Sequence, residues 1–281
     1  MRPEAAPTIR RIVVAMDASA HSQAALEAAI TMATRFGAQL QGLYVEDVNV
    51  LRIAGLPNAH EFGIHSARWR RVTAGDVERQ LRVRSREVQE EFQRLTARAA
   101  VLGTFHVARG TVDIEIRAAA AQADMLVVGR VGWSQLRRRQ VGSTARALCG
   151  AAETDVIAVL HAGTRIDPPL MVVWHGGDPS ERTLALAAGL ATGTTPIELL
   201  AVAQDDVQLE TAELALDKAL AELGLANRRH RMVLPSSADL VQAARVFGAG
   251  TLLAPGCLAC LEGDGLVSLL SQVDVPILLV R

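Results

Sequence analysis

Short apolar runs alternate with amphipathic stretches along the whole chain. The first run covers residues 12–16 and is rich in valine, which is typical of a strand buried on both faces of a parallel sheet. Residues 17–19 supply side chains that can cap a helix, and the Ala-rich stretch that follows continues through Phe36 to Gly37. This pattern predicts a strand followed directly by a helix.

The rest of the first half keeps this alternation. It predicts further strands at 39–45, 105–108, 125–128 and 156–160, and helices at 76–101, 111–122 and 142–152. Strands that alternate with helices favour right-handed crossovers and a parallel sheet covered on both faces. Residues 46–75 interrupt the alternation with a polar stretch, which we expect to form a surface loop or mobile lid.

The second half repeats the first. Residues 171–174 match 12–15 at an offset of 159, 198–202 match 41–45 at 157, and 249–254 match 123–128 at 126. The first of these offsets aligns Asp17 with Gly176. Glycine and prolines in residues 162–169 mark a linker. The sequence therefore predicts two domains, at 9–161 and 169–281.

Composition excludes several classes of function. The 29 basic and 30 acidic residues leave a net charge of -1, and aromatic residues are 3% of the chain, so neither duplex nor single-stranded nucleic acid is an expected partner. The single lysine, Lys218, rules out a P-loop. No apolar run is long enough for a membrane span or a signal peptide. Three cysteines cannot form a disulfide scaffold in a chain of this size, so we expect a protein of the reducing cytoplasm.

A glycine motif follows the predicted strand at 125–128. Residues 129–132 read Gly-Arg-Val-Gly, and after nine residues the chain continues as Gly-Ser-Thr at 142–144. Glycines permit a close approach of the backbone, and a helix that starts at Gly142 directs free N–H groups and its positive dipole end to one point. The pattern indicates a phosphate site, with Asp17 placed to bind a sugar or base. A purely structural role, in which the glycines end a strand and start a helix, remains open.

Met16-Asp17-Ala18-Ser19 after a Val-rich strand, together with the glycine pattern, resembles the universal stress protein family over essentially the whole chain. The resemblance implies two tandem, doubly wound, Rossmann-like α/β domains, each with a parallel five-stranded sheet, packed as a pseudo-dimer. It also implies that residues 156–160 and 275–280 pair antiparallel across the pseudo-twofold axis.

The family's nucleotide-binding branch implies ATP, with or without Mg²⁺, as the ligand of the first half. The implied nucleotide-binding residues are Ala15, Met16, Asp17, Val45, Val128, Gly129, Arg130, Gly132, Gly142, Ser143 and Thr144. Two departures stand out: Tyr44 replaces a usual histidine, and Ala145 replaces a usual hydroxyl residue that helps to bind phosphate. The second half lacks the motif, so we expect one nucleotide site per chain.

The resemblance implies a regulatory protein of the stress response. Binding of the nucleotide would bias its conformation or its choice of an unidentified protein partner. A homodimer is left open. One alternative is a slow ATPase or phosphotransferase in the same pocket, although no catalytic base or carboxylate pair lies near the glycines in sequence. Another is an interaction module that binds no nucleotide.

Two weaker signals remain. Cys257 and Cys260 form a CxxC that could be a disulfide or half of a zinc site, or could be two thiols buried in the core. Residues 137–139 are three arginines within the nucleotide loop, and they could bind a terminal phosphate or form a solvated surface run.

Overall fold

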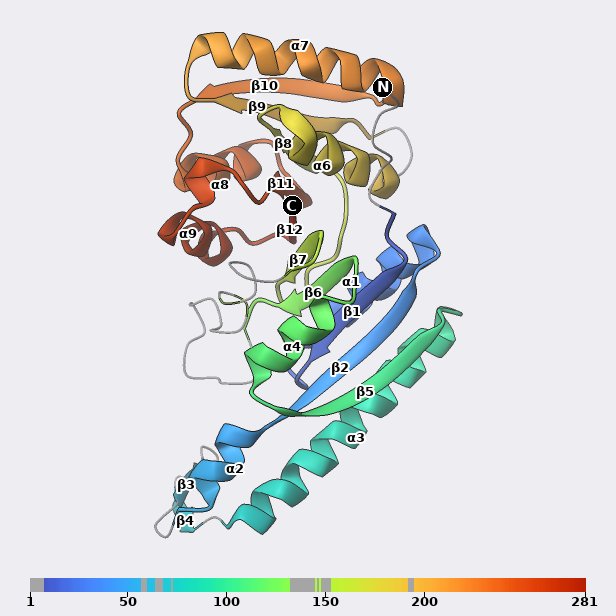
Figure 1. The fold of residues 1–281 in the computed structure, drawn as a ribbon, viewed down its shortest axis with the longest axis vertical. Helices are drawn as coiled ribbons and strands as arrows, with labels where there is room; N and C mark the ends of the chain where they lie inside the picture. Colours follow the sequence, from blue (N-terminus) through green and yellow to red (C-terminus); the bar gives the residue numbers. More distant parts are fainter. Residues whose placement is uncertain are drawn as a thin grey trace.

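The computed structural model describes residues 8–56, 60–63, 68–71, 73–131, 145, 147, 153–191 and 195–281. One twisted sheet runs through the length of the molecule, with helices on both faces (Figure 1). Within the described part of the chain, no helix is long and apolar enough to cross a membrane.

The large sheet holds strands from both halves in the order β10-β9-β8-β11-β12-β7-β6-β1-β2-β5. The first half supplies β1 (Arg11–Met16), β2 (Gln39–Asp47), β5 (Gly103–Gly110), β6 (Met125–Gly129) and β7 (Val156–Leu160). The second supplies β8 (Leu170–Trp174), β9 (Ile197–Ala203), β10 (Asn227–Val233), β11 (Thr251–Pro255) and β12 (Ile277–Val280). Five strands per half, parallel within each half, confirm the predicted fold class.

Two hydrophobic cores lie on opposite faces of this sheet. One is covered by α1 (Ala20–Phe36), α3 (Ala74–Arg98), α6 (Gly177–Leu190) and α7 (Asp206–Leu223). The other is covered by α4 (Val112–Ala120), α8 (Ser237–Val246), η2 (Ala259–Leu261) and α9 (Asp264–Gln272). The strands between them are buried on both faces, which explains why their sequences are continuously apolar.

The sheets of the two halves join where β7 pairs with β12. Strands β7 and β12 run antiparallel, with Val159 opposite Ile277 and Val156 opposite Val280. The predicted pairing across the pseudo-twofold axis is confirmed, and it joins the two parallel sheets into one. All described strands of the first half fall within 9–161 and those of the second within 169–281; that the halves are separate domains stays a prediction.

The segment between β2 and β5 is more ordered than its sequence indicates. It contains α2 (Val48–Ala54) and a hairpin of β3 (His60–Gly63) with β4 (Arg68–Arg71), which project from the body beside the start of α3 (Figure 1). The expectation of an irregular surface loop is therefore wrong for the described residues of 46–75, and the alternative, a mobile lid, stays a prediction. The signals were weak because each element is short: α2 has seven residues, and the two hairpin strands have four each and are rich in polar residues.

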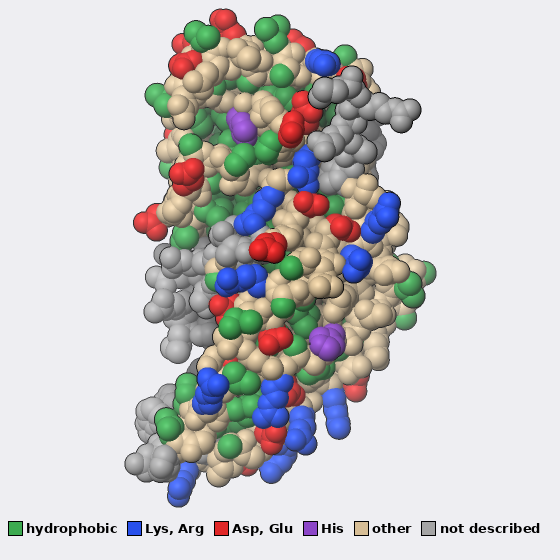
Figure 2. Space-filling model, viewed as in Figure 1, with side chains coloured by type: hydrophobic (Ala, Val, Ile, Leu, Met, Phe, Trp, Pro, Cys, Tyr) green, Lys and Arg blue, Asp and Glu red, His purple; other side chains and the backbone are tan. Residues whose placement is uncertain are grey.

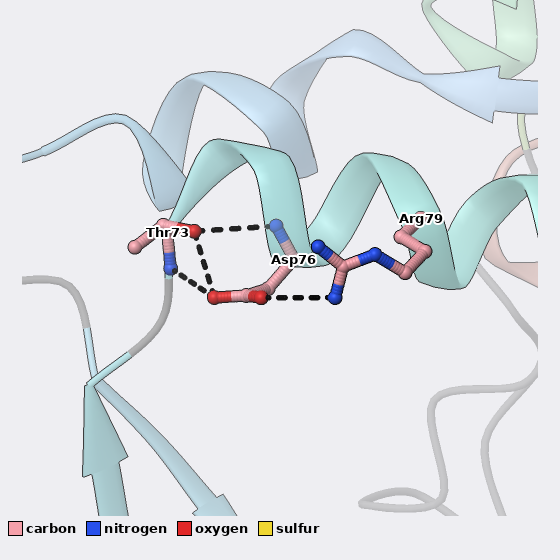
Figure 3. Close-up of polar contacts among 3 residues, drawn as sticks. All are labelled: Thr73, Asp76 and Arg79. Atoms are coloured by element: carbon pink, nitrogen blue, oxygen red, sulfur yellow. Dashed lines mark hydrogen bonds and ion pairs between the residues drawn. The ribbon is translucent and has the colours of Figure 1, made fainter.

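A capping box starts α3 where this projection joins it (Figure 3). The Thr73 hydroxyl accepts from the Asp76 amide at 3.2 Å, and the Thr73 amide donates to the Asp76 carboxylate at 3.3 Å. Arg79 pairs with the same carboxylate at 3.4 Å. These bonds satisfy N–H groups that a helix start leaves unpaired, so α3 begins at a defined residue. Arg side chains gather over this end of the molecule (Figure 2).

The strand registers correct the alignment of the two halves. In the first half Val14 lies opposite Val127, and in the second Val172 lies opposite Leu253. With the offset of 126 between β6 and β11, Val127 corresponds to Leu253, so Val14 corresponds to Val172 at an offset of 158. The predicted offset of 159, and with it the match of Asp17 to Gly176, is wrong by one residue. A run of valines buried on both faces has no alternation that would fix its register.

A repeated hydrogen bond confirms the corrected alignment. The amide of Asp17 donates to the Ser22 hydroxyl at 3.1 Å, and the amide of His175 donates to the Ser180 hydroxyl at 3.1 Å. Asp17 and His175 are 158 residues apart, and so are Ser22 and Ser180. His175 is therefore the structural counterpart of Asp17.

Candidate functional site

The candidate site lies where the strand order of the first half reverses. The chain passes from β1 to β2 and β5 on one side, and then returns to β6 and β7 on the other side of β1. Neighbouring strands β1 and β6 are parallel, so both end at the same edge of the sheet. Ligands of open α/β sheets bind beyond the carboxyl ends of strands at such a reversal.

Asp17 follows β1 at this edge. Its amide donates to the Ser22 hydroxyl at 3.1 Å, and its carboxylate Oδ1 accepts from the Ser19 amide at 3.1 Å. Ser19 is the N-cap of α1 and accepts from the Ser22 amide. Between them Ala18 has a φ of 62°, which is uncommon for a residue other than glycine. These bonds hold the Asp17 carboxylate in a fixed turn between strand and helix.

Gly129 ends β6 and lies against the start of α1. A Cβ at this position would lie 2.9 Å from the His21 carbonyl carbon and 3.0 Å from the Ser22 amide nitrogen. A larger residue could not fit without a shift of backbone. The glycine therefore brings the end of β6 into direct contact with the first turn of α1, which the glycine motif predicted in general terms.

The other described candidates surround the same edge. Met16 is the last residue of β1 and Val128 is the last but one of β6, and both are buried. Ala15 and Val45 are half-buried and contact the core that α4, α8 and α9 cover. Met16 lies opposite Tyr44, so Val45 is level with Asp17.

The side chain of Arg130 crosses to the second half. It is 8% exposed, and its Nη1 donates to the carbonyl oxygens of Leu270 at 3.1 Å and Ser271 at 3.3 Å, in the last turn of α9. Burial lowers the pKa of Arg130, and its Nε is buried without a hydrogen-bond partner. Its own amide donates to the Leu160 carbonyl at 2.7 Å. Arg130 thus connects the turn after Gly129 to the second half.

Two histidines lie beside this arginine. The rings of His21 and His161 are 5.5 Å apart, and His21 Nδ1 accepts from the Ala162 amide at 2.9 Å. Burial, and then the charge of Arg130, lower the pKa of both; that of His161 falls to about 4. Both rings are therefore neutral at pH 7. This cluster was not predicted, because the sequence indicates only that His161 follows a strand and that His21 lies at the start of a helix.

Most of the remaining predicted residues lie outside the part of the chain that the structure describes. Gly132, Gly142, Ser143 and Thr144 lie outside the described residues, as do the three arginines at 137–139 and Cys149. Ala145 is described, is helical and is buried in the second core. Within the described residues, the structure brings together the ends of β1, β2 and β6 with the start of α1.

The CxxC has two unlike thiols. Cys260 is half-buried against the second core, and burial raises its pKa. Cys257 is exposed, and both cysteines are free. The interpretation as two core thiols is therefore wrong for Cys257. Among the residues that the structure describes, no group of three or more His, Cys, Asp or Glu could hold a metal ion.

Comparison with protein families decides what the chain is related to. The model of the universal stress protein family matches residues 8–159. The chain belongs to this family. No curated protein matches it.

Solved structures agree on the fold. A universal stress protein from Archaeoglobus fulgidus DSM 4304 aligns over 96% of both chains with 14% identity and a TM-score of 0.72. One from Pseudomonas aeruginosa UCBPP-PA14 aligns over 98% of this chain and 94% of its own, with 15% identity and a TM-score of 0.57. A universal stress protein in complex with cAMP aligns over 56% of this chain and 99% of its own, with 19% identity and a TM-score of 0.38. The two full-length alignments show that both halves of the chain share the universal stress protein fold.

Proposed function

We propose that the first half binds one adenine nucleotide, ATP, and that this universal stress protein is regulatory: occupancy of the site biases its conformation or its choice of protein partner. The observation that supports this most is the juxtaposition of Asp17 and Gly129 at the reversal of strand order. A carboxylate there can accept from ribose hydroxyls, and a glycine lets a phosphate approach backbone N–H groups.

The proposal assigns roles residue by residue. Ala15 and Val128 contribute backbone to adenine recognition, Val45 borders the adenosine, and Asp17 binds the ribose. Gly132, Gly142, Ser143 and Thr144 are assigned to the phosphates by the family's motif. Arg130 enters the proposal as the residue that fixes the turn, because its guanidinium already donates to α9.

Any Mg²⁺ would arrive with the phosphates of ATP. Asp17, the one described carboxylate assigned to the site, is directed at the ribose, and the described residues offer no cluster that could bind a cation alone. The neutral histidines nearby are His21, whose Nδ1 is already an acceptor, and His161, half-buried beside Arg130. Burial lowers the pKa of both rings, which weakens them as bases for water, so binding is favoured over hydrolysis.

Calorimetric titration with ATP tests the proposal. We expect one site per chain in the unmodified protein. Asp17→Ala should weaken ATP roughly tenfold to a hundredfold, the effect of one lost hydrogen bond to a charged group. Gly142→Val should weaken it by several orders of magnitude, because a branched side chain would obstruct two or three charge-assisted bonds of about 1.5–3 kcal/mol each.

The second half supplies matched controls. His175 is the counterpart of Asp17, so His175→Ala should leave ATP affinity unchanged, and so should Gly256→Val. Two sites per chain, or equal losses from Asp17→Ala and His175→Ala, would show that the halves are assigned wrongly. Titration with cAMP tests the choice of nucleotide, and phosphate release at saturating ATP would favour the ATPase instead. If neither nucleotide bound, the result would support the remaining alternative, an interaction module that binds no nucleotide.

A further inference from the structure

A cysteine and a histidine meet in the second half at the place that corresponds to the nucleotide site of the first. The sulfur of Cys257 lies 3.4 Å from Nε2 of His175, within hydrogen-bond distance for a thiol. Cys257 is exposed, and His175 is half-buried. The two residues are 82 apart in sequence, so the fold and not the chain brings them together.

Their position is set by the topology of the sheet. The second half reverses its strand order between β8 and β11, as the first half does between β1 and β6. His175 follows β8 directly, and Cys257 is the second residue after the end of β11. The pair therefore occupies the edge at which an open α/β sheet binds its ligands.

The correspondence between the halves shows what has replaced the nucleotide machinery. His175 stands where the first half has Asp17, as the matching bonds to Ser180 and Ser22 show. At the offset of 126, Cys257 stands where the first half has Val131, two residues after Gly129. A carboxylate and a glycine turn are thus exchanged for an imidazole and a thiol.

The chemistry of the pair suits a nucleophile and its base. The contact of 3.4 Å places Nε2 of His175 to take the thiol proton. Burial lowers the pKa of His175, which keeps the ring neutral at pH 7 but also makes it a weaker base than a free imidazole. A thiolate, and not a thiol, attacks sulfur, and an adjacent base is the usual means of forming one. Cys257 is also reachable from solvent, whereas Cys260 is half-buried and its pKa is raised by burial.

We propose that Cys257 and His175 form a thiol–disulfide exchange site for small disulfides, with Cys257 as the nucleophile and His175 as its base. His175 takes the proton of the Cys257 thiol. The thiolate then attacks one sulfur of the disulfide, the S–S bond breaks, and a mixed disulfide forms on Cys257. The second sulfur leaves as a thiolate and takes up a proton. This site needs no metal, and it is independent of nucleotide binding in the first half.

The reaction of the intact chain with dithiobis(nitrobenzoate), an aromatic disulfide whose released thiolate absorbs light, tests the site. We expect one fast thiol at pH 7. Cys257→Ser should abolish the fast phase, while Cys260→Ser should retain it. His175→Gln should slow it about tenfold or more, the lower end of what a positioned base contributes. The matched control is His106→Gln, which removes an exposed histidine of β5.

The pH dependence separates a base from a merely structural histidine. At about pH 9 most of an ordinary thiol is ionised without a base. The reaction rates of the unmodified protein and of His175→Gln should therefore differ by less than about twofold at that pH. An equal rate at pH 7, or a difference that persists undiminished at pH 9 in a variant that unfolds normally, would overturn the proposal. So would a fast phase that survives Cys257→Ser.

Discussion

The guanidinium of Arg130 donates to the carbonyl oxygen of Leu270 at 3.1 Å, across 140 residues of sequence and from one half of the molecule to the other. Carbonyls in the last turn of a helix have no partner within the helix, and the negative end of the helix dipole favours a cation there. Arg130 supplies both a hydrogen-bond donor and a positive charge at this helix end. The turn that follows Gly129 in the first half is therefore coupled directly to α9 in the second.

Replacing Arg130 should destabilise the chain. Arg130→Met keeps much of the volume but removes charge-assisted bonds to the end of α9, so we expect the free energy of unfolding to fall by about 2–3 kcal/mol. Denaturant unfolding measures the loss. Arg245 offers the control, because it also donates to this helix end, at the Gln272 carbonyl, but is exposed. Arg245→Met should change stability by less than about 0.5 kcal/mol. Equal effects would show that burial of Arg130 contributes nothing.

Stability should fall in acid because of His161. Its pKa is about 4 in the folded chain against an ordinary histidine value of 6.5, so the unfolded state binds the extra proton first as the pH falls. The contribution of His161 is complete above pH 6.5 and is lost as the pH falls toward 4. Screening by solvent reduces it to about 1–2 kcal/mol.

Urea unfolding at pH 7 and pH 5 checks this dependence. His161→Gln should lose less stability than the unmodified chain between these two values. Because Nε2 of His161 is buried without a hydrogen-bond partner, the substitution removes no bond at that atom. An unchanged pH dependence in His161→Gln would assign the titration to another group.

The strand pair β7–β12 should be intolerant of charge. Val159 is 3% exposed and lies opposite Ile277, so Val159→Asp would bury a carboxylate without a partner. We expect a loss of at least about 3 kcal/mol, with separation of the halves or aggregation. Size-exclusion chromatography and thermal unfolding report both. Val207→Asp, at a position 74% exposed, should behave as the unmodified chain does.

What the sequence could predict depended on how local each signal was. The first helix was predicted to begin after Ser19 and to end at Gly37, because both caps act on neighbouring residues, and both are confirmed. The juxtaposition of Asp17 and Gly129 also followed, since alternating strands and helices allow few topologies. That a nucleotide binds there stays a prediction.

Longer-range relationships could not be predicted. Nothing in the sequence around Arg130 indicates that its side chain reaches α9, because that contact depends on how the halves pack. The match between His175 and Asp17 was missed for a different reason. Apolar strands align nearly as well after a shift of one residue, and only the paired registers of β1 with β6 and β8 with β11 fix the correct one.

The close approach at Gly129 leads to a prediction that links stability to the proposed site. In Gly129→Ala, the new Cβ would lie 2.9 Å from the His21 backbone, which cannot move without shifting the start of α1. We expect the free energy of unfolding to fall by about 1–3 kcal/mol, as in other overpacked sites. The same shift would displace Asp17, which is bonded to Ser22, so ATP affinity should fall as well.

Gly256→Ala is the matched control for that substitution. Its Cβ would lie 3.6 Å from the Val280 carbonyl oxygen, an ordinary contact, so stability should stay within about 0.5 kcal/mol and ATP affinity should be unchanged. Unfolding and calorimetric titration of the two variants separate packing from binding. If Gly129→Ala lost stability but bound ATP normally, the contact of β6 with α1 would be structural only, and the nucleotide would have to be held without the turn at Asp17.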